Sequence, residues 1–138
     1  MRKMGVVLVG ASACALGLWV SGHARAGFKT SEEVAVITIP NGNGSRAAVG
    51  QIGAARNTLD TVQYIGCTAR QNVGGALTVG CSARDALGDT LTCTSSNASL
   101  LPIIGAMTAD ARIGFGADAA GVCTYIFTDN SSKYQPKK

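Results

Sequence analysis

The chain has 138 residues, of which 46% are hydrophobic and only 14% are charged. This composition is too apolar and too weakly charged for a disordered chain, and the length allows one domain. Three of the positive charges, on Arg2, Lys3 and Arg25, lie near the N-terminus. The rest of the chain carries 9 basic and 8 acidic side chains, so no basic field for nucleic acid is left.

Residues 1–26 have the order of a signal peptide. Arg2 and Lys3 give a positive start, residues 6–20 form an apolar run, and residues 24–26 (Ala-Arg-Ala) match the pattern that a signal peptidase cleaves. We expect cleavage after Ala26 and export to the periplasm or the extracellular space of a bacterium. The mature chain then has 112 residues.

Two other interpretations of this segment stay open. A membrane anchor needs about 20 apolar residues, and glycines and a serine interrupt this run. A lipoprotein would be acylated at Cys14, but Ala11 stands where such signals usually carry a large aliphatic residue. Cleavage after Ala26 predicts a mature protein without a stable membrane span.

A single β-rich domain is predicted over residues 34–129. Residues 27–33 before it are polar and are predicted to be a loose segment. The β-branched run 34–39 predicts a strand, residues 41–44 (Asn-Gly-Asn-Gly) favour a turn, and residues 46–52 supply a returning strand.

The next segment predicts a three-stranded antiparallel meander. Residues 62–70, 76–84 and 90–94 alternate between apolar and polar side chains. A turn centred near residue 74 sets Cys67 opposite Cys81, and a turn centred near residue 87 sets Cys93 on the other side of Cys81. The three cysteines then form one row across the sheet.

The cysteine row assigns the two faces of the meander, because side chains alternate along each strand. The inward set is Ile65, Cys67, Ala69, Val79, Cys81, Ala83, Leu91 and Cys93. The outward set is Thr68, Arg70, Thr78, Ser82, Arg84, Thr92 and Thr94.

The C-terminal part predicts one helix and one more hairpin. Residues 100–107 favour a short helix with Pro102 in its first turn. Residues 111–115 and 121–128 predict a hairpin, and residues 130–138 form a polar tail. About seven short strands and one helix predict an all-β, mainly antiparallel fold: a small sandwich or open barrel stapled by disulfides.

Four cysteines follow the signal segment: Cys67, Cys81, Cys93 and Cys123. An even number in an oxidising compartment predicts two disulfides. All three pairings are open, and a bridge from Cys81 to either neighbour in the row is geometrically easy. We favour Cys81–Cys93 with Cys67–Cys123, and the alternative is Cys67–Cys81 with Cys93–Cys123.

A set of short motifs runs through most of the mature chain. The most distinctive is the block Gln63-Tyr64-Ile65-Gly66-Cys67. The other motifs are Ala55-Arg56-Asn57, Cys81-x-Ala83-Arg84 with Gly88 and Cys93, Phe115, Gly121-x-Cys123 and Ser132-x-Tyr134-x-Pro136-Lys137. With these motifs the chain resembles an uncharacterised group of small exported bacterial proteins. The resemblance implies export and a disulfide-linked fold, and it implies no catalytic residues.

Signal cleavage also removes the only His, His23, and the only Trp, Trp19. Loss of His excludes Ser-His-Asp and Cys-His catalysis and His-ligated metal sites from the mature protein. The cysteines have no C-x-x-C spacing. We therefore expect no enzyme activity, no metal and no cofactor.

A carboxylate-based enzyme is the remaining catalytic hypothesis. Its candidate residues are Glu32, Glu33, Asp60, Asp85, Asp89, Asp110, Asp118 and Asp129. Most of the aspartates lie in or beside predicted turns, where Asp makes local hydrogen bonds. The turn interpretation is favoured over the catalytic one.

Three arginines are the polar side chains that we single out for binding. Arg70 and Arg84 on the outer face, with Arg56, could recognise an anion or a carboxylate. The competing interpretation is that they are ordinary solvated arginines, or that Arg56 pairs with Asp60 to hold a loop. The Thr-rich outer face likewise has two interpretations, a binding surface or ordinary exposed strands.

The leading hypothesis is an exported, non-enzymatic binding or structural module whose partner is a protein or a surface polymer. A small exported inhibitor of a hydrolase is the alternative. It would bind its target through residues 41–45 or through residues 72–75.

Overall fold

The computed structural model describes residues 30–40 and 42–134. The predicted signal peptide and the tip of the predicted tail, residues 135–138, lie outside the described residues.

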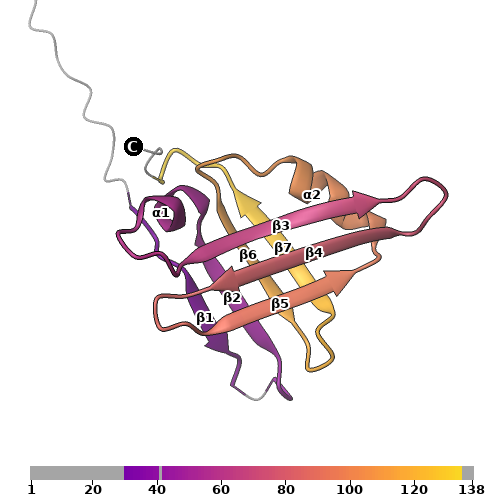
Figure 1. The fold of residues 1–138 in the computed structure, drawn as a ribbon, viewed down its shortest axis with the longest axis horizontal. Coiled ribbons are helices and arrows are strands. Elements are labelled where there is room, and N and C mark those ends of the chain that lie inside the picture. The colour runs from indigo at the N-terminus through magenta and orange to yellow at the C-terminus, as the bar shows by residue number, and fades with distance from the viewer. Residues whose placement is uncertain (1–29, 41, 135–138) are drawn as a thin grey trace, which may run out of the picture.

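The described chain forms two antiparallel sheets and a short α-helix after the meander, which confirms the predicted all-β, mainly antiparallel fold (Figure 1). Its strands are β1 (Ala35–Thr38), β2 (Arg46–Gln51), β3 (Tyr64–Gln71), β4 (Leu77–Arg84), β5 (Thr90–Ser95), β6 (Arg112–Ala117) and β7 (Cys123–Asp129). Its helices are α1 (Ile52–Asn57), the 3-10 turn η1 (Ala98–Leu100) and α2 (Leu101–Gly105).

One sheet has four strands in the order β1-β2-β6-β7. The predicted first hairpin is its β1–β2 edge, and the predicted last hairpin is β6–β7. β6 lies in the middle and is buried on both faces after its first residue. Its inward side chains Ile113 and Phe115 have no solvent exposure, so they form the centre of the core.

The other sheet is the predicted meander, in the order β3-β4-β5. Cys67 pairs with Cys81, and Cys81 pairs with Cys93, as the turn positions predict. The strands of this sheet cross those of the four-stranded sheet in Figure 1. The core lies between the two sheets, with Val79 and Phe115 both fully buried.

The assignment of faces in the meander holds for most positions. Six of the eight inward residues are buried: Ile65, Val79, Cys81, Ala83, Leu91 and Cys93. Cys67 is half-buried and Ala69 is exposed. Ala69 lies near the end of β3 that leads into the β3–β4 turn, and this hairpin extends past the body of the domain in Figure 1.

Hydrogen bonds join the two sheets along the edge of β5. The Arg46 side chain of β2 donates to the Thr90 carbonyl at 2.9 Å. The Thr94 amide donates to the Gly121 carbonyl in the β6–β7 turn at 3.0 Å. The first bond holds β2 against β5, and the second holds the β6–β7 turn against β5.

The disulfides join Cys67 to Cys81 and Cys93 to Cys123. The favoured pairing, Cys81–Cys93 with Cys67–Cys123, is wrong, and the alternative is correct. The physical reason lies in the β6–β7 turn, since its contact with Thr94 brings Cys123 next to Cys93. Cys67 on the edge strand β3 is left to bond Cys81.

Helix α1 replaces the end of a predicted strand, which was expected to run to residue 52. Ile52 and Ala55 are spaced three residues apart and pack against the core and β3. A side chain at Gly53 would lie 2.7 Å from an Asp110 carboxylate oxygen, so this helix needs glycine there to approach the opposite loop. The Thr58 hydroxyl donates to the Ala55 carbonyl and closes the last turn.

The folded domain is longer than the predicted span of 34–129. The Thr30 amide donates to the Lys133 carbonyl at 3.0 Å, and the Gln51 amide donates to the Glu32 carbonyl at 3.0 Å. Tyr134 is only 8% exposed. Residues 30–33 and 130–134 therefore belong to the fold, where a loose segment and a polar tail were expected.

Candidate binding surface

The outer face of the three-stranded sheet carries a shallow hollow. Tyr64, Gly66 and Thr68 of β3 face outward, and their partners across the sheet include Ser82 and Gly80 of β4. Because two of these outward positions are glycines, the sheet is bare at its centre. We call this the outer hollow; its outward-facing lining is Tyr64, Gly66, Thr68, Gly80, Ser82, Thr92 and Thr94.

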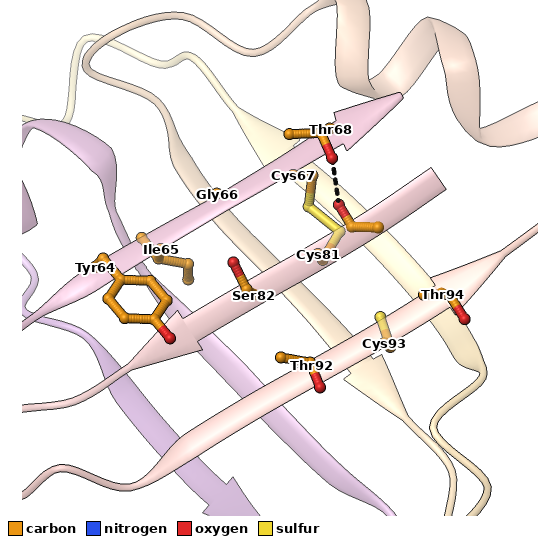
Figure 2. A pocket seen from close by; sticks show the side chains of 11 residues that line it. Tyr64, Ile65, Gly66, Cys67, Thr68, Cys81, Ser82, Thr92, Cys93 and Thr94 are labelled. Carbon is orange, nitrogen blue, oxygen red and sulfur yellow. Dashed lines mark hydrogen bonds between the residues drawn. A yellow bond between two sulfur atoms is a disulfide. The ribbon is translucent and has the colours of Figure 1, made fainter. Parts of the chain in front are cut away.

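The outer hollow has a volume of about 450 Å³. A Cβ atom added at Gly66 would meet no atom within 4 Å, so this glycine leaves open space above the sheet. Figure 2 shows Tyr64 at one end and Thr94 at the other, with Ser82 and Thr92 between them. Tyr64 is 44% exposed, so its ring forms a wall that a ligand can touch.

Hydroxyl groups line the outer hollow. The Thr68 hydroxyl donates to the Gly80 carbonyl at 3.5 Å, a long contact (Figure 2). The hydroxyls of Ser82, Thr92 and Thr94 have no hydrogen-bond partner within the described part of the chain. Each one is a donor and an acceptor for a polar ligand.

Two smaller hollows adjoin the outer hollow, one sharing Tyr64 and Ile65 with it and the other sharing Thr94. One has a volume of about 220 Å³, lies beside α1 and is lined by Arg56, Gln63 and Tyr64 among others. The other has a volume of about 350 Å³ and is lined by Thr78, Thr94 and Val122 among others. The shared residues show that the three hollows are neighbours, from α1 and the start of β3 to the end of β5. We call these three neighbouring hollows the outer track.

The structure does not gather Arg56, Arg70 and Arg84 into one patch. Arg84 pairs with Tyr64 and Arg70 pairs with Thr78, which lies six residues from Arg84 along β4, or about 20 Å. The Arg84 guanidinium lies 3.4 Å from the position of a Cβ at Gly88, so this side chain leans over the β4–β5 turn. Arg56 lines the hollow beside α1, and Arg84 lies opposite Tyr64 at that end of the sheet. Arg70 lies opposite Thr78 at the other end.

The charge of the three strands has one sign. β3, β4 and β5 contain Arg70 and Arg84 and no Asp or Glu. An anionic group approaching this face therefore meets no carboxylate on the strands. The face favours neutral or negatively charged ligands.

The predicted aspartate turns are present. The Asp85 carboxylate accepts from the amides of Leu87 and Asp89, and that of Asp118 accepts from the amides of Ala120 and Val122. Asp129 accepts from the Ser131 amide, which lowers the pKa of its carboxyl group. These three carboxylates hold turns, as the turn interpretation predicts.

Asp60 holds the loop before β3, although its partner is not Arg56. Its carboxylate accepts from the amides of Val62 and Gln63, each at 2.8 Å, and from the Gln63 side chain at 2.7 Å. Hydrogen bonds from Gln63 are the largest cause that lowers the pKa of Asp60 from 3.8 to about 2. The Gln63 side chain in turn accepts from the Val34 amide, so Asp60 ties β3 to the start of the domain.

Glu32 forms an ion pair with Arg112 on the four-stranded sheet. The hydrogen bond that Arg112 donates to the Glu32 carboxylate raises the pKa of Arg112, and the guanidinium lies 5.2 Å from the centre of the Phe127 ring. Sequence reasoning did not find this pair, because 80 residues separate the two side chains. It fixes the N-terminal segment and belongs to the fold.

The sulfur atoms of Cys81, Cys93 and Cys123 lie within 4.8 Å of one another. Such a cluster of thiolates is typical of a soft-metal site. Here the sulfurs belong to two disulfides, Cys67–Cys81 and Cys93–Cys123, and a thiolate is the form of cysteine that binds a metal. The cluster is therefore a pair of neighbouring disulfides.

No helix in residues 30–40 and 42–134 is long and apolar enough to cross a membrane. Comparisons of this chain with protein-family models, with curated proteins and with solved structures give no match.

Proposed function

We propose that the mature chain is an exported, non-enzymatic binding module that holds a polysaccharide of the cell envelope or its surroundings on the outer track. The observation that carries the proposal is a series of three neighbouring hollows, the central one on a sheet whose strands carry arginines and no carboxylate. Neighbouring hollows suit an extended polymer better than a compact small molecule, because successive units of the polymer can occupy successive hollows.

The chemistry of the lining supports a hydroxyl-rich ligand with carboxylate groups. Ser82, Thr92 and Thr94 offer free hydroxyls to the hydroxyls of a sugar chain. Arg70 and Arg84 stand at opposite ends of the face, and a guanidinium binds a carboxylate in bidentate fashion. Tyr64 supplies one apolar wall, so hydrogen bonds and charge provide more of the expected affinity than ring stacking does.

Export and the disulfides fit this role. The signal-peptide pattern of residues 1–26 predicts delivery outside the cytoplasm, where envelope polymers are found. Two disulfides suit an oxidising compartment. A rigid small sandwich then presents one face to the polymer.

Affinity electrophoresis through gels that contain a soluble polyuronate or a neutral glucan tests the proposal. We expect the polyuronate to retard the protein, with a retardation that falls as salt is raised. The variant Gly66→Val should fill the hollow without a clash and weaken binding about tenfold or more, a loss of about 1.4 kcal/mol. Ala35→Val, at an exposed strand position of the other sheet, is the matched control and should bind like the wild type.

Equal retardation of the wild type and Gly66→Val would contradict the outer track as the binding surface. Retardation by the neutral glucan alone would contradict the role of the arginines. Arg70→Ala and Arg84→Ala separate these outcomes, since each is expected to reduce polyuronate binding and leave stability unchanged.

A hydrolase inhibitor is the second candidate, and one observation favours it. The β3–β4 hairpin protrudes from the domain in Figure 1, and Val73 at its tip is fully exposed. The Gly75 amide donates to the Asn72 carbonyl at 2.9 Å, which gives the tip a defined turn. A rigid, protruding turn with an apolar side chain suits insertion into an enzyme cleft.

The substitution Val73→Asp tests this second candidate. If the hairpin blocks a secreted glycoside hydrolase or peptidase, the variant should lose inhibition and keep polyuronate binding. If the wild type inhibits no hydrolase of the host's own secreted fraction, the inhibitor hypothesis is wrong.

A further inference from the structure

The four cysteines come together at one place in the sandwich. Cys67, Cys81 and Cys93 form a row across β3, β4 and β5, and Cys123 reaches them from β7 in the opposite sheet. The Cys81 sulfur, which is bonded to Cys67, lies within 4.8 Å of both sulfurs of the other disulfide. The Cys81 sulfur is therefore close enough to the Cys93–Cys123 disulfide for the two bridges to exchange partners.

The two disulfides differ in access and in what they join. Cys67 is half-buried on the edge strand β3, while Cys81, Cys93 and Cys123 are 3%, 2% and 9% exposed. A dissolved thiol therefore reaches Cys67 more readily than the other three sulfurs. Cys67–Cys81 lies within one sheet, whereas Cys93–Cys123 joins the two sheets.

We propose that Cys81 couples the two disulfides, so that a thiol acting on the accessible Cys67–Cys81 bridge opens the buried Cys93–Cys123 bridge between the sheets. The site is a thiol–disulfide exchange site, and its co-reactant is a dithiol, either a small molecule or a protein. The inference does not depend on the proposed polymer binding.

The exchange proceeds in balanced steps. A thiolate of the dithiol attacks the Cys67 sulfur, and the bonding electron pair leaves on the Cys81 sulfur as a thiolate. The Cys81 thiolate attacks the Cys93 sulfur, a Cys81–Cys93 bond forms, and Cys123 leaves as a thiolate that takes a proton from water. The second thiol of the dithiol then displaces Cys67 as a free thiol, so the dithiol is oxidised and the protein gains two electrons and two protons.

The register of the sheet places Cys93 within the range of a new bridge. Cys93 stands directly opposite Cys81, as Cys67 does on the other side. The N–H and C=O groups of one residue in an antiparallel strand point to the same neighbouring strand, so the two pairs differ in kind. Cys67–Cys81, with its Cα atoms 4.0 Å apart, is the non-hydrogen-bonded pair. Cys81–Cys93 is the hydrogen-bonded pair, with a Cα separation of about 5.5 Å that a disulfide can span. The exchange removes the covalent link between the sheets and keeps one within the β3-β4-β5 sheet.

Two single-cysteine variants test the proposal. Cys67→Ala leaves Cys81, Cys93 and Cys123, which can form Cys93–Cys123 or Cys81–Cys93 if the sulfurs exchange. Cys81→Ala is the matched control, because it leaves Cys67 as the odd thiol, and Cys67 is outside the cluster of three sulfurs. Each purified variant is alkylated with N-ethylmaleimide, quenched in acid and digested with trypsin.

The sequence makes the result easy to read. Cleavage after Arg56, Arg70, Arg84, Arg112 and Lys133 places each of the four cysteines in its own peptide. In Cys67→Ala we expect label on both Cys81 and Cys123. The amounts of the two labelled peptides should lie within about tenfold of each other, which corresponds to a free-energy difference of up to about 1.4 kcal/mol between the two bridges. In Cys81→Ala we expect label on Cys67 alone.

Label confined to Cys81 in the Cys67→Ala variant would overturn the proposal. If that variant does not fold, the wild type is treated briefly with dithiothreitol and then alkylated. A linked pair of peptides 71–84 and 85–112, which reports Cys81–Cys93, is the expected product. Loss of Cys67–Cys81 with no such pair would also overturn it.

Discussion

Both sheets have glycines on their outer faces, but only the four-stranded sheet covers them with side chains. A Cβ at Gly114 would lie 2.4 Å from the Phe127 ring, and one at Gly116 would lie 2.4 Å from the Tyr125 ring. A Cβ at Gly66 on the three-stranded sheet would meet nothing within 4 Å. The same residue type thus seats an aromatic ring on one face and leaves a hollow on the other.

The two faces also differ in charge and in what lies over them. Arg112 of β6 pairs with Glu32 and lies over the Phe127 ring, so the four-stranded sheet uses these side chains within the fold. The hydroxyls of Ser82 and Thr92 on the three-stranded sheet stay open to a ligand. The outer face of the four-stranded sheet therefore contributes to the stability of the domain, whereas the outer face of the three-stranded sheet has hydroxyls that are free to contact a ligand.

Removing the bridge between the sheets is expected to have the largest effect on stability. The variant Cys93→Ala/Cys123→Ala opens a loop of sequence separation 30 and should lower the free energy of unfolding by about 3–4 kcal/mol. The variant Cys67→Ala/Cys81→Ala opens a loop of sequence separation 14 within a hairpin. Its loss in the free energy of unfolding should be smaller by about 0.7 kcal/mol, because the loop is shorter. Urea titration of both double variants measures the two losses, and the reverse order would contradict the account of which link joins the sheets.

Filling the covered glycines should cost less than the bridge but remain easy to measure. Gly114→Ala forces the Phe127 ring away from the sheet and from Arg112, and its Cβ also approaches the Ala48 carbonyl at 3.1 Å. Overpacking of this kind costs about 1–3 kcal/mol. Thermal unfolding checks the value, and an unchanged stability would show that the ring does not need the glycine.

Filling the open glycine should leave stability almost unchanged. Gly66→Val adds a β-branched side chain to a strand at a position with free space, so the change in the free energy of unfolding should stay within about 0.5 kcal/mol or be favourable. Together with Gly114→Ala it forms a matched pair. A large loss at Gly66 would mean that the outer hollow is part of the packing.

The smallest effect is the pH dependence that Asp60 confers on the loop before β3. Its pKa is lowered to about 2 in the folded chain, so its contribution is present above about pH 4 and is lost as the pH falls toward 2. Asp60→Asn cannot titrate, so the difference in unfolding free energy between wild type and variant should shrink from pH 4 to pH 2. Chemical denaturation at each pH measures it, and a constant difference would contradict the role of the carboxylate.

The register of the meander could be predicted because a strand has a side-chain period of two and two short turns fix the offset. That reasoning placed Cys67, Cys81 and Cys93 in one row, and the structure confirms it. The disulfide partners could not be predicted in this way. They depend on where the β6–β7 turn meets Thr94, a contact between segments distant in the sequence.

Three other features had a signal in the sequence, although sequence reasoning did not use it. Helix α1 follows β2 without a break, and its signal was the spacing of Ile52 and Ala55. The outer hollow had a readable signal too, since Gly66 and Gly80 both fall at outward positions of the predicted meander. The predicted register also places Arg70 and Arg84 at opposite ends of the three-stranded sheet, because Arg70 lies opposite Thr78, six residues from Arg84 along β4.

The most direct test of the central claim is an amide chemical-shift titration of the mature protein with an oligouronate. The account predicts that the largest shifts gather at Gly66, Ser82 and Thr92 on the three-stranded sheet, and that Gly66→Val needs about tenfold more ligand to produce the shifts at Ser82 and Thr92. Shifts that gather instead at Tyr125 and Phe127 on the four-stranded sheet, or around Val73 at the hairpin tip, would contradict it.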